Sequence, residues 1–195
     1  ITMRQCESVI ETKWQEQKVE ESEDKLQITT ILTDKDRNQI LHIVNYHFEQ
    51  KAIEVISEFQ NLSEKPLTLE MLSSFSLGGI TPFVADEGTN CLTVHKMRSR
   101  WSGEGRMETR TAEDLLLEPT WSRHGVYSDK FGQTGSLPVR GYFPFVAVED
   151  VNEQVIWAAA LACPSSWQME LYRRDEALAM SGGVADYDFG HWCKE

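Results

Sequence analysis

Alternating apolar and polar residues, interrupted by turn signals, are the feature that most constrains what this chain can fold into. Across 26–32 and again across 67–77, apolar residues fall on every second position, which places them on one face of a β-strand. Turn residues separate such runs at intervals of about ten residues, a rhythm typical of antiparallel sandwiches rather than of strand–helix–strand units. The sequence therefore predicts an all-β fold, an antiparallel two-sheet β-sandwich.

Further strands are expected where apolar residues recur with the same period. Ile53, Val55 and Phe59 are expected to face inward within one of them. The remaining strand predictions cover residues 40–48, 91–95, 142–149, 154–162 and 167–173.

Two segments admit more than one structure. The alanine-rich run 157–162 has the propensity of a short helix, but its apolar character favours a central strand packed on both sides. Residues 104–117 have weak helical periodicity, and a long loop or a hairpin is an equally good prediction for them.

Length and charge limit the classes of protein and of partner. A chain of 195 residues with 41% apolar residues can bury a full core, so a single domain spanning 1–195 is predicted. The net charge of −12 argues against nucleic acid or an anionic membrane surface as a partner, whereas a neutral sugar is compatible with it. No run of 18 apolar residues occurs that would cross a membrane.

The cysteines and the first residues of the chain indicate the cellular compartment in which the protein is expected. Four scattered cysteines without a C-x-x-C pair are typical of thiols in a reducing compartment, which predicts a cytoplasmic location; they are Cys6, Cys91, Cys163 and Cys193. Residues 1–9 lack the charged-then-apolar layout of a signal peptide. Because the chain does not begin with methionine, Ile1 is expected to be a processed or excised end.

The sequence predicts no metal site and no cofactor. Asp34, Asp36 and Asn38 imitate half of a calcium loop, but the glycine and glutamate that such a loop requires are absent, which favours an Asx turn. His42 and His47 are five residues apart on a predicted strand and so lie on opposite faces. The pair formed by residues 191 and 193 lacks a second pair of ligands.

Residues 95–106 form the one basic segment of an acidic chain, and Trp101 lies within it. Because arginine and tryptophan concentrate interface energy, Arg98, Arg100 and Trp101 are candidate anchors of a protein–protein contact; a solvated loop is the alternative. Trp101 and Trp121 lie among polar residues and are also candidate platforms for a sugar. Two other tryptophans, Trp157 and Trp167, lie in apolar strand patterns and are expected in the core.

Four segments, in this order along the chain, resemble the N-terminal β-supersandwich of α-galactosidases in glycoside hydrolase family thirty-six. They are 57–74 with its Pro66-Leu67 strand start, 95–106 with Arg100-Trp101, 136–148 with its PFVAV strand, and the glycine-rich 181–192. The family's His-Gln-His-Asn-Pro-Phe motif is replaced here by residues 139–145.

This resemblance implies a galactose mutarotase-like supersandwich fold and a non-catalytic role. In that family a (β/α)₈ barrel following this domain carries the nucleophile and the general acid/base, so the resemblance assigns no catalytic residue to this chain. The parent enzyme would be a retaining α-galactosidase-type hydrolase that removes terminal α-linked galactose, or a related sugar, from oligosaccharides, whereas the isolated chain would be inactive. Its partners would be the barrel of the same chain and further subunits of a homo-oligomer.

By the same resemblance, the chain begins after the family's first strands and ends before its last ones. Residues 186–195 are therefore expected to form a strand that lacks its natural neighbour. Two other functions are alternatives. One is a free-standing carbohydrate-binding module that uses Trp101 and Trp121. The other is a mutarotase-like sugar epimerase, which needs a histidine and a carboxylate that converge on a pocket.

Overall fold

The computed structural model describes residues 11–69, 71–80, 88–118, 127–135, 137, 139–162, 165–174, 177–185 and 191–193. The chain divides into two compact units, one formed by Ile1–Ser74 with Phe189–Glu195 and the other by Phe75–Asp188. The single folding domain remains a prediction. Across the residues described, no helix has the length and apolar character needed to cross a membrane.

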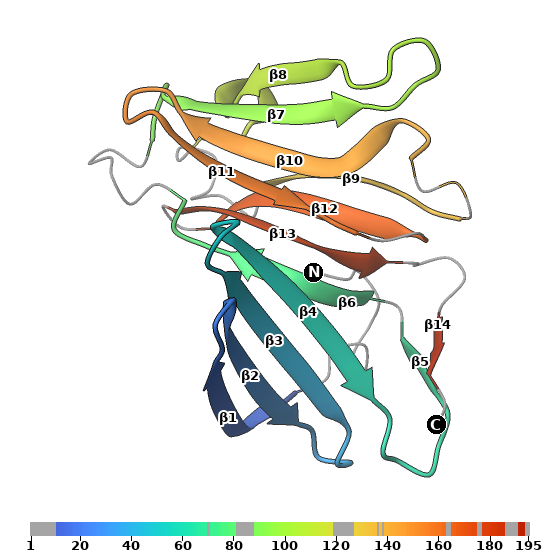
Figure 1. The fold of residues 1–195 in the computed structure, drawn as a ribbon. Coiled ribbons are helices and arrows are strands. Elements are labelled where there is room, and N and C mark those ends of the chain that lie inside the picture. The colour runs from blue at the N-terminus through green and yellow to red at the C-terminus, as the bar shows by residue number, and fades with distance from the viewer. Residues whose placement is uncertain are drawn as a thin grey trace. The chain divides into compact units, whose positions relative to one another are not determined.

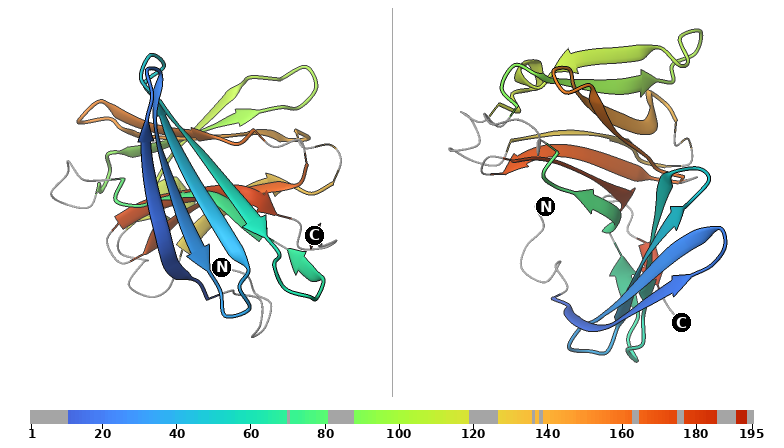
Figure 2. Two further views of the ribbon diagram at one scale, coloured as in Figure 1. Left: turned by 60° about the horizontal axis from the view of Figure 1, so that its bottom comes forward. Right: turned by 60° about the vertical axis from the view of Figure 1, so that its left-hand side comes forward.

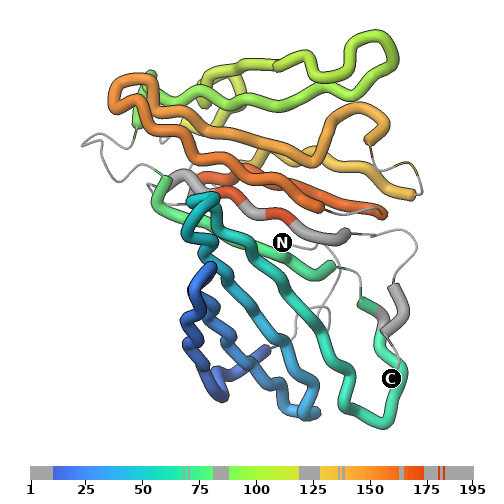
Figure 3. Tube along the Cα trace, in the orientation of Figure 1, coloured from blue at the N-terminus to red at the C-terminus, as the bar shows by residue number. Residues whose placement is uncertain are grey.

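The first unit is built on a four-stranded antiparallel meander. Its strands pair in chain order, and they are β1 (Lys13–Glu21), β2 (Lys25–Thr33), β3 (Gln39–His47) and β4 (Ala52–Gln60). Figures 1 and 3 show the chain passing through the four strands with short connections between them. The turn between β2 and β3 is an Asx turn, in which Asp34 Oδ1 accepts hydrogen bonds from the backbone N–H groups of Asp36 and Asn38 at 2.8 Å. The predicted Asx turn is confirmed.

Register explains why one face of this sheet is apolar. Val19 lies opposite Ile28, Ile28 opposite Val44 and Val44 opposite Val55, so one row of aliphatic side chains crosses all four strands. Ile53 shares this face, but its side chain is 67% exposed. The prediction that Ile53 packs inward is wrong, because this residue lies near the start of an edge strand, where one neighbouring strand is missing.

The first unit also contains a two-stranded sheet. In it β5 (Leu67–Leu69) pairs with β14 (His191–Cys193) in antiparallel register. The end of the chain therefore does contain a strand within 186–195, as predicted, but this strand has β5 as its neighbour. Residues 186–190 and 194–195 lie outside the described residues.

Two further four-stranded sheets belong mostly to the second unit, and one of their strands, β6, has residues in both units. One sheet has the order β11-β10-β7-β8, with β7 (Leu92–Arg98), β8 (Met107–Thr111), β10 (Tyr142–Asp150) and β11 (Val155–Ala160). The other has the order β6-β13-β12-β9, with β6 (Met71–Leu77), β9 (Tyr127–Gln133), β12 (Trp167–Arg174) and β13 (Ala177–Ala185). A 3₁₀ turn, η1 (Glu113–Leu115), follows β8.

The core of this unit lies between its two sheets (Figures 1 and 2). Leu92 and Val94 of β7 and Val146 and Val148 of β10 come from one sheet, and the other contributes buried side chains such as Met169. The remaining buried members include Ile80, Leu117, Leu161, Trp167, Leu171 and Met180. The predicted all-β, antiparallel two-sheet sandwich is therefore confirmed.

Both ambiguous segments form strands. The alanine-rich run belongs to β11, but β11 is an edge strand with alternating half-buried and exposed residues, so the prediction of a central strand packed on both sides is wrong. Residues 104–117 form the second half of a hairpin, β8, and the turn η1. Trp167 is in the core and Trp157 packs against it, as expected.

Close approach of two strands in the second sheet depends on one glycine. Gly132 of β9 lies opposite Gln168 of β12, and a Cβ atom on residue 132 would lie 2.2 Å from the carbonyl oxygen of Trp167. Real Cβ contacts are not found at that separation, so the backbones would have to move apart.

Gly132→Ala is therefore expected to destabilise the chain by at least about 2 kcal/mol, because the clash is with backbone that cannot rotate away. Gly78→Ala is the control, since nothing lies within 4 Å of a Cβ there. Urea unfolding measures both variants. Equal stability of the two would show that the close approach at Gly132 is not real.

Candidate functional site

The β7–β8 hairpin carries most of the predicted site residues. Strand β7 extends to Arg98, so the connection itself covers only residues 99–106. Backbone hydrogen bonds close it: Arg98 N–H donates to Arg106 O and Gly105 N–H to Arg98 O, both at 2.8 Å. Ser102 has a φ of 62° and Gly105 a φ of 77°, the left-handed values that tight connections use. The hairpin loop is thus a defined structure.

Hydrogen bonds of Ser99 connect the hairpin to the neighbouring segment of the chain. Its N–H donates to Gly141 O at 3.0 Å, and its hydroxyl accepts from Gly141 N–H at 2.8 Å. The same hydroxyl donates to Val139 O. These bonds join the end of β7 to the segment that leads into β10, so the loop starts from a fixed base.

Trp101 lies in this loop with 93% of its surface exposed. Arg100 and Arg106, on either side of it in the chain, are exposed as well. The loop lies at one end of the β11-β10-β7-β8 sheet (Figures 1 and 2). Trp121, the other predicted platform, lies outside the described residues.

Arg98 lies below the loop and is partly buried in an ion pair. Its guanidinium contacts the Glu108 carboxylate and lies 4.3 Å from the ring centroid of Tyr142. Tyr142 O–H donates to the same carboxylate at 3.1 Å, and Arg110 Nε lies 3.3 Å from it. Arg98 is therefore engaged within the sandwich, whereas Arg100 and Trp101 are accessible to a partner.

Lys96 is buried, although it belongs to the basic segment 95–106, for which a partner contact or a solvated loop is expected. On β7 it continues the inward row that starts with Leu92 and Val94. Its ammonium group pairs with Asp129 of β9, in the opposite sheet, and lies 4.6 Å from the ring centroid of Phe131. A buried ammonium is tolerated because it has both a counter-ion and an aromatic face. For Lys96, the expectation of a partner contact or a solvated loop is therefore wrong.

The groups in this network also shift one another's pKa values. Burial raises the pKa of the Glu108 carboxyl, but the hydrogen bond from Tyr142 and the charge of Arg98 outweigh burial, so this pKa lies below its ordinary value. Burial, and then the neighbouring Glu108 carboxylate, raise the pKa of Tyr142. At neutral pH Glu108 is therefore an acceptor, and Tyr142 keeps the proton that it donates.

A histidine and a carboxylate meet on the other face of the same sheet. His95 Nε2 lies 3.0 Å from Glu149 Oε2, and His95 Nδ1 lies 3.0 Å from Thr109 Oγ1. Sequence reasoning found no such pair, because only the register of β8, β7 and β10 brings these residues together. This cluster spans three adjacent strands of one sheet face.

The other candidate ligands have separate partners. His42 Nδ1 lies 3.3 Å from Ser57 Oγ, and His47 Nε2 lies 3.6 Å from Glu54. No group of three or more metal-ligating side chains is found among the residues that the structure describes. The strand that holds residues 191 and 193 is described, but their side chains are not.

Comparisons with protein-family models, with curated proteins and with solved structures find no match for this chain.

Replacing Glu108 by glutamine is expected to destabilise the chain at neutral pH by about 1–3 kcal/mol, because it removes charged hydrogen bonds from Arg98 and Tyr142. A lowered folded pKa gives stability that is present above the ordinary pKa of 4.5 and is lost as pH falls through the folded value. The difference between wild type and Glu108→Gln should therefore shrink in acid. Urea unfolding across this range measures it, and a pH-independent difference would contradict the assignment.

Trp101→Ala is expected to change the free energy of unfolding by less than about 0.5 kcal/mol, because the side chain is 93% exposed. Trp167→Ala is the matched comparison and should cost about 3–5 kcal/mol, since Trp167 is 2% exposed. Thermal and urea melts compare the two. A large loss on Trp101→Ala would place that side chain in the core.

Proposed function

We propose that this chain is a non-catalytic β-sandwich domain of a retaining, cytoplasmic α-galactosidase-type glycoside hydrolase, in which the β7–β8 hairpin anchors contacts with the catalytic barrel or a neighbouring subunit. The observation that carries the anchoring role is Trp101, which is 93% exposed on a hydrogen-bonded hairpin. A large aromatic side chain held in water on a defined loop gains free energy when a partner covers it.

Charge supports the same role. The hairpin presents Arg100 and Arg106 beside Trp101 in a chain with a net charge of −12. Arginine and tryptophan are the residue types that dominate interface energetics, and a cationic loop on an acidic chain is complementary to acidic surface. Arg98 contributes indirectly, because its pairing with Glu108 holds the end of β7.

The α-galactosidase assignment comes from the sequence resemblance and from the agreement in fold class. An antiparallel two-sheet sandwich is the fold that the resemblance implies. Fold agreement alone is a weak argument for function, since one fold hosts many activities. The catalytic carboxylates of such an enzyme belong to the barrel, so the chain itself should be inactive.

Activity assays test the non-catalytic role. The purified chain should not hydrolyse aryl α-galactosides above the background of a mock purification. Turnover that copurifies with the chain through successive columns would contradict the proposal.

Sedimentation velocity tests the anchoring role. Wild-type chain should self-associate at high concentration, and Trp101→Ala should weaken that association. Val151→Ala is the matched control, because Val151 is also exposed but follows the end of β10 remote from Tyr142 and the hairpin. A wild-type chain that stays monomeric, or equal effects of the two variants, would contradict a subunit contact through Trp101.

A further inference from the structure

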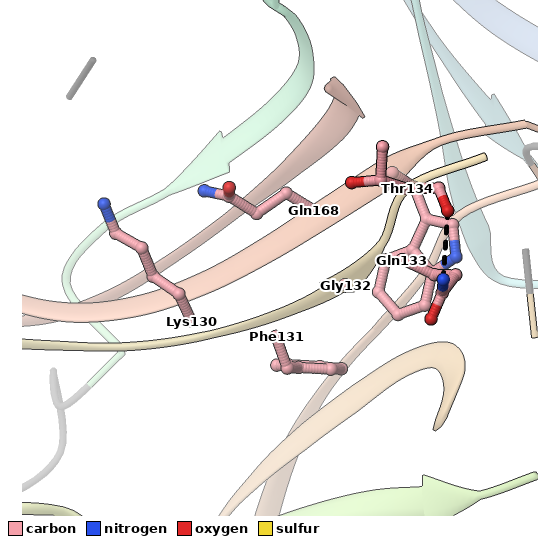
Figure 4. Close-up of a pocket in the computed structure, with 7 residues that line it drawn as sticks. Lys130, Phe131, Gly132, Gln133, Thr134 and Gln168 are labelled. Atoms are coloured by element: carbon pink, nitrogen blue, oxygen red, sulfur yellow. Dashed lines mark hydrogen bonds between the residues drawn. The ribbon is translucent and has the colours of Figure 1, made fainter. Parts of the chain in front are cut away.

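The cavity of about 220 Å³ beside β9 and β12 does not offer one continuous surface to a ligand (Figure 4). Lys130 and Gln168 project on one side of the two strands and Phe131 on the other, with the backbones between them. No small ring can contact both sets of side chains. A surface that can bind a partner lies instead at the edge of the four-stranded sheet of the first unit.

Strand β1 forms one edge of that sheet, next to β2 (Figures 1 and 3). All nine of its residues are exposed, and Val19 is 62% exposed. An edge strand presents unpaired backbone N–H and C=O groups, to which a further strand can bond. Val19 also ends the aliphatic row that contains Ile28, Val44 and Val55. A strand added at this edge would extend the row.

The β1–β2 ladder determines which backbone groups point to the open edge. Ser22 N–H donates to Lys25 O at 2.9 Å, so these two residues form a hydrogen-bonded pair. In an antiparallel ladder such pairs alternate with pairs that exchange no bonds with each other. Counting back along β1 from this pair, Gln17, Val19 and Glu21 present their N–H and C=O groups to the open edge.

The charges of β1 complement a second copy of the same strand. In an antiparallel pair of β1 strands centred on Val19, Lys18 of each copy lies opposite Glu20 of the other. Val19 then lies opposite Val19, and Gln17 opposite Glu21, so the outward backbone groups of the two copies face one another. Opposite charges directly across two strands stabilise their pairing.

Neighbouring registers are less favourable. Centring the pair on Lys18 or on Glu20 would place like charges opposite each other. Centring it on Gln17 pairs Glu16 with Lys18, but it also places Val19 opposite position 15, where the register between β1 and β2 shifts. The register centred on Val19 uses only the regular part of the strand.

We propose that β1 is a self-association edge, at which two copies of this chain pair their β1 strands antiparallel across residues 17–21, centred on Val19. The outward backbone groups form the hydrogen bonds, and the Lys18–Glu20 pairs between copies set the register. Because the contact is short, the dimer is weak and forms at high concentration. It uses residues of the first unit and does not rest on Trp101 or on the proposed α-galactosidase role.

Sedimentation velocity in the Trp101→Ala background tests this pairing without the hairpin contact. Lys18→Glu and Glu20→Lys should each weaken dimerisation about tenfold, because each places two like-charge pairs across the strands. An equimolar mixture of the two variants should dimerise again, since their charges complement each other. Glu58→Lys is the control, because Glu58 is exposed on β4, at the opposite edge of the sheet.

Unfolding curves show that each variant retains the fold. A Trp101→Ala chain that stays monomeric, or a mixture that associates no better than its two components, would overturn the proposal. Neither result bears on a hairpin contact, which the shared substitution at Trp101 removes from every sample.

Cysteine substitution in the same background tests the register. Residues opposite each other in a hydrogen-bonded pair have Cα atoms about 5.5 Å apart, within the range of a disulfide. Val19→Cys should therefore give a disulfide-linked dimer under mild oxidation. Glu21→Cys should not, because residue 21 of the other copy lies four residues away along the strand, roughly 13 Å. Equal cross-linking of the two variants above the background of the parent chain, or none, would overturn the proposed register.

Discussion

The second unit is organised around one constraint, which is the buried positive charge of Lys96 at the end of a row of apolar side chains on β7. Lys96 follows Leu92 and Val94 on the inward face of β7, where an unpaired ammonium would cost several kcal/mol. Asp129 supplies the counter-ion from β9 in the facing sheet, and Phe131 supplies an aromatic face. The Lys96–Asp129 ion pair thus joins the two sheets in addition to their apolar packing. It forms only where β7 and β9 bring these two side chains together across the interior.

The hairpin depends on this arrangement. Beyond Lys96, Arg98 and Glu108 continue the ionic network toward the loop that holds Trp101. On the other side, Phe131 contacts Lys96 and is in edge-to-face contact with Trp167 of β12. Strand β9 therefore presents Asp129 and Phe131 to the sandwich interior, while Lys130 and Gly132 face the other way.

Much of the fold could be predicted, because burial leaves a periodic pattern in the sequence. Strands β2, β10 and β12 have alternating or apolar runs and were predicted close to their observed positions. Strand β1 was missed because it is exposed along its whole length and has no apolar period. Two predictions of burial are wrong because the residues lie in edge strands. Ile53 of β4 and the alanine run of β11 are apolar, which predicts packing on the core, yet a neighbouring strand covers only one side of each.

The site could be predicted only in part. Exposure of Trp101 follows from its polar neighbours, whereas the burial of Lys96 depends on Asp129, which is 33 residues away. Cross-strand register likewise brings His95 to Glu149, and Gly132 into close approach with the backbone of β12. Such contacts leave no local signal, since they arise from pairing between strands that are distant in the sequence.

Hydrogen exchange at the hairpin tests the central claim most directly, namely that the buried network holds the loop as a defined structure. The amides of Arg98, Ser99 and Gly105 donate to backbone oxygens at 2.8–3.0 Å and should exchange slowly in the wild-type chain. In a folded Lys96→Met chain, which leaves Asp129 without its partner, these three amides should exchange faster while those of β12 stay protected. Fast exchange of the three amides in the wild-type chain, or the same protection in both chains, would contradict the account.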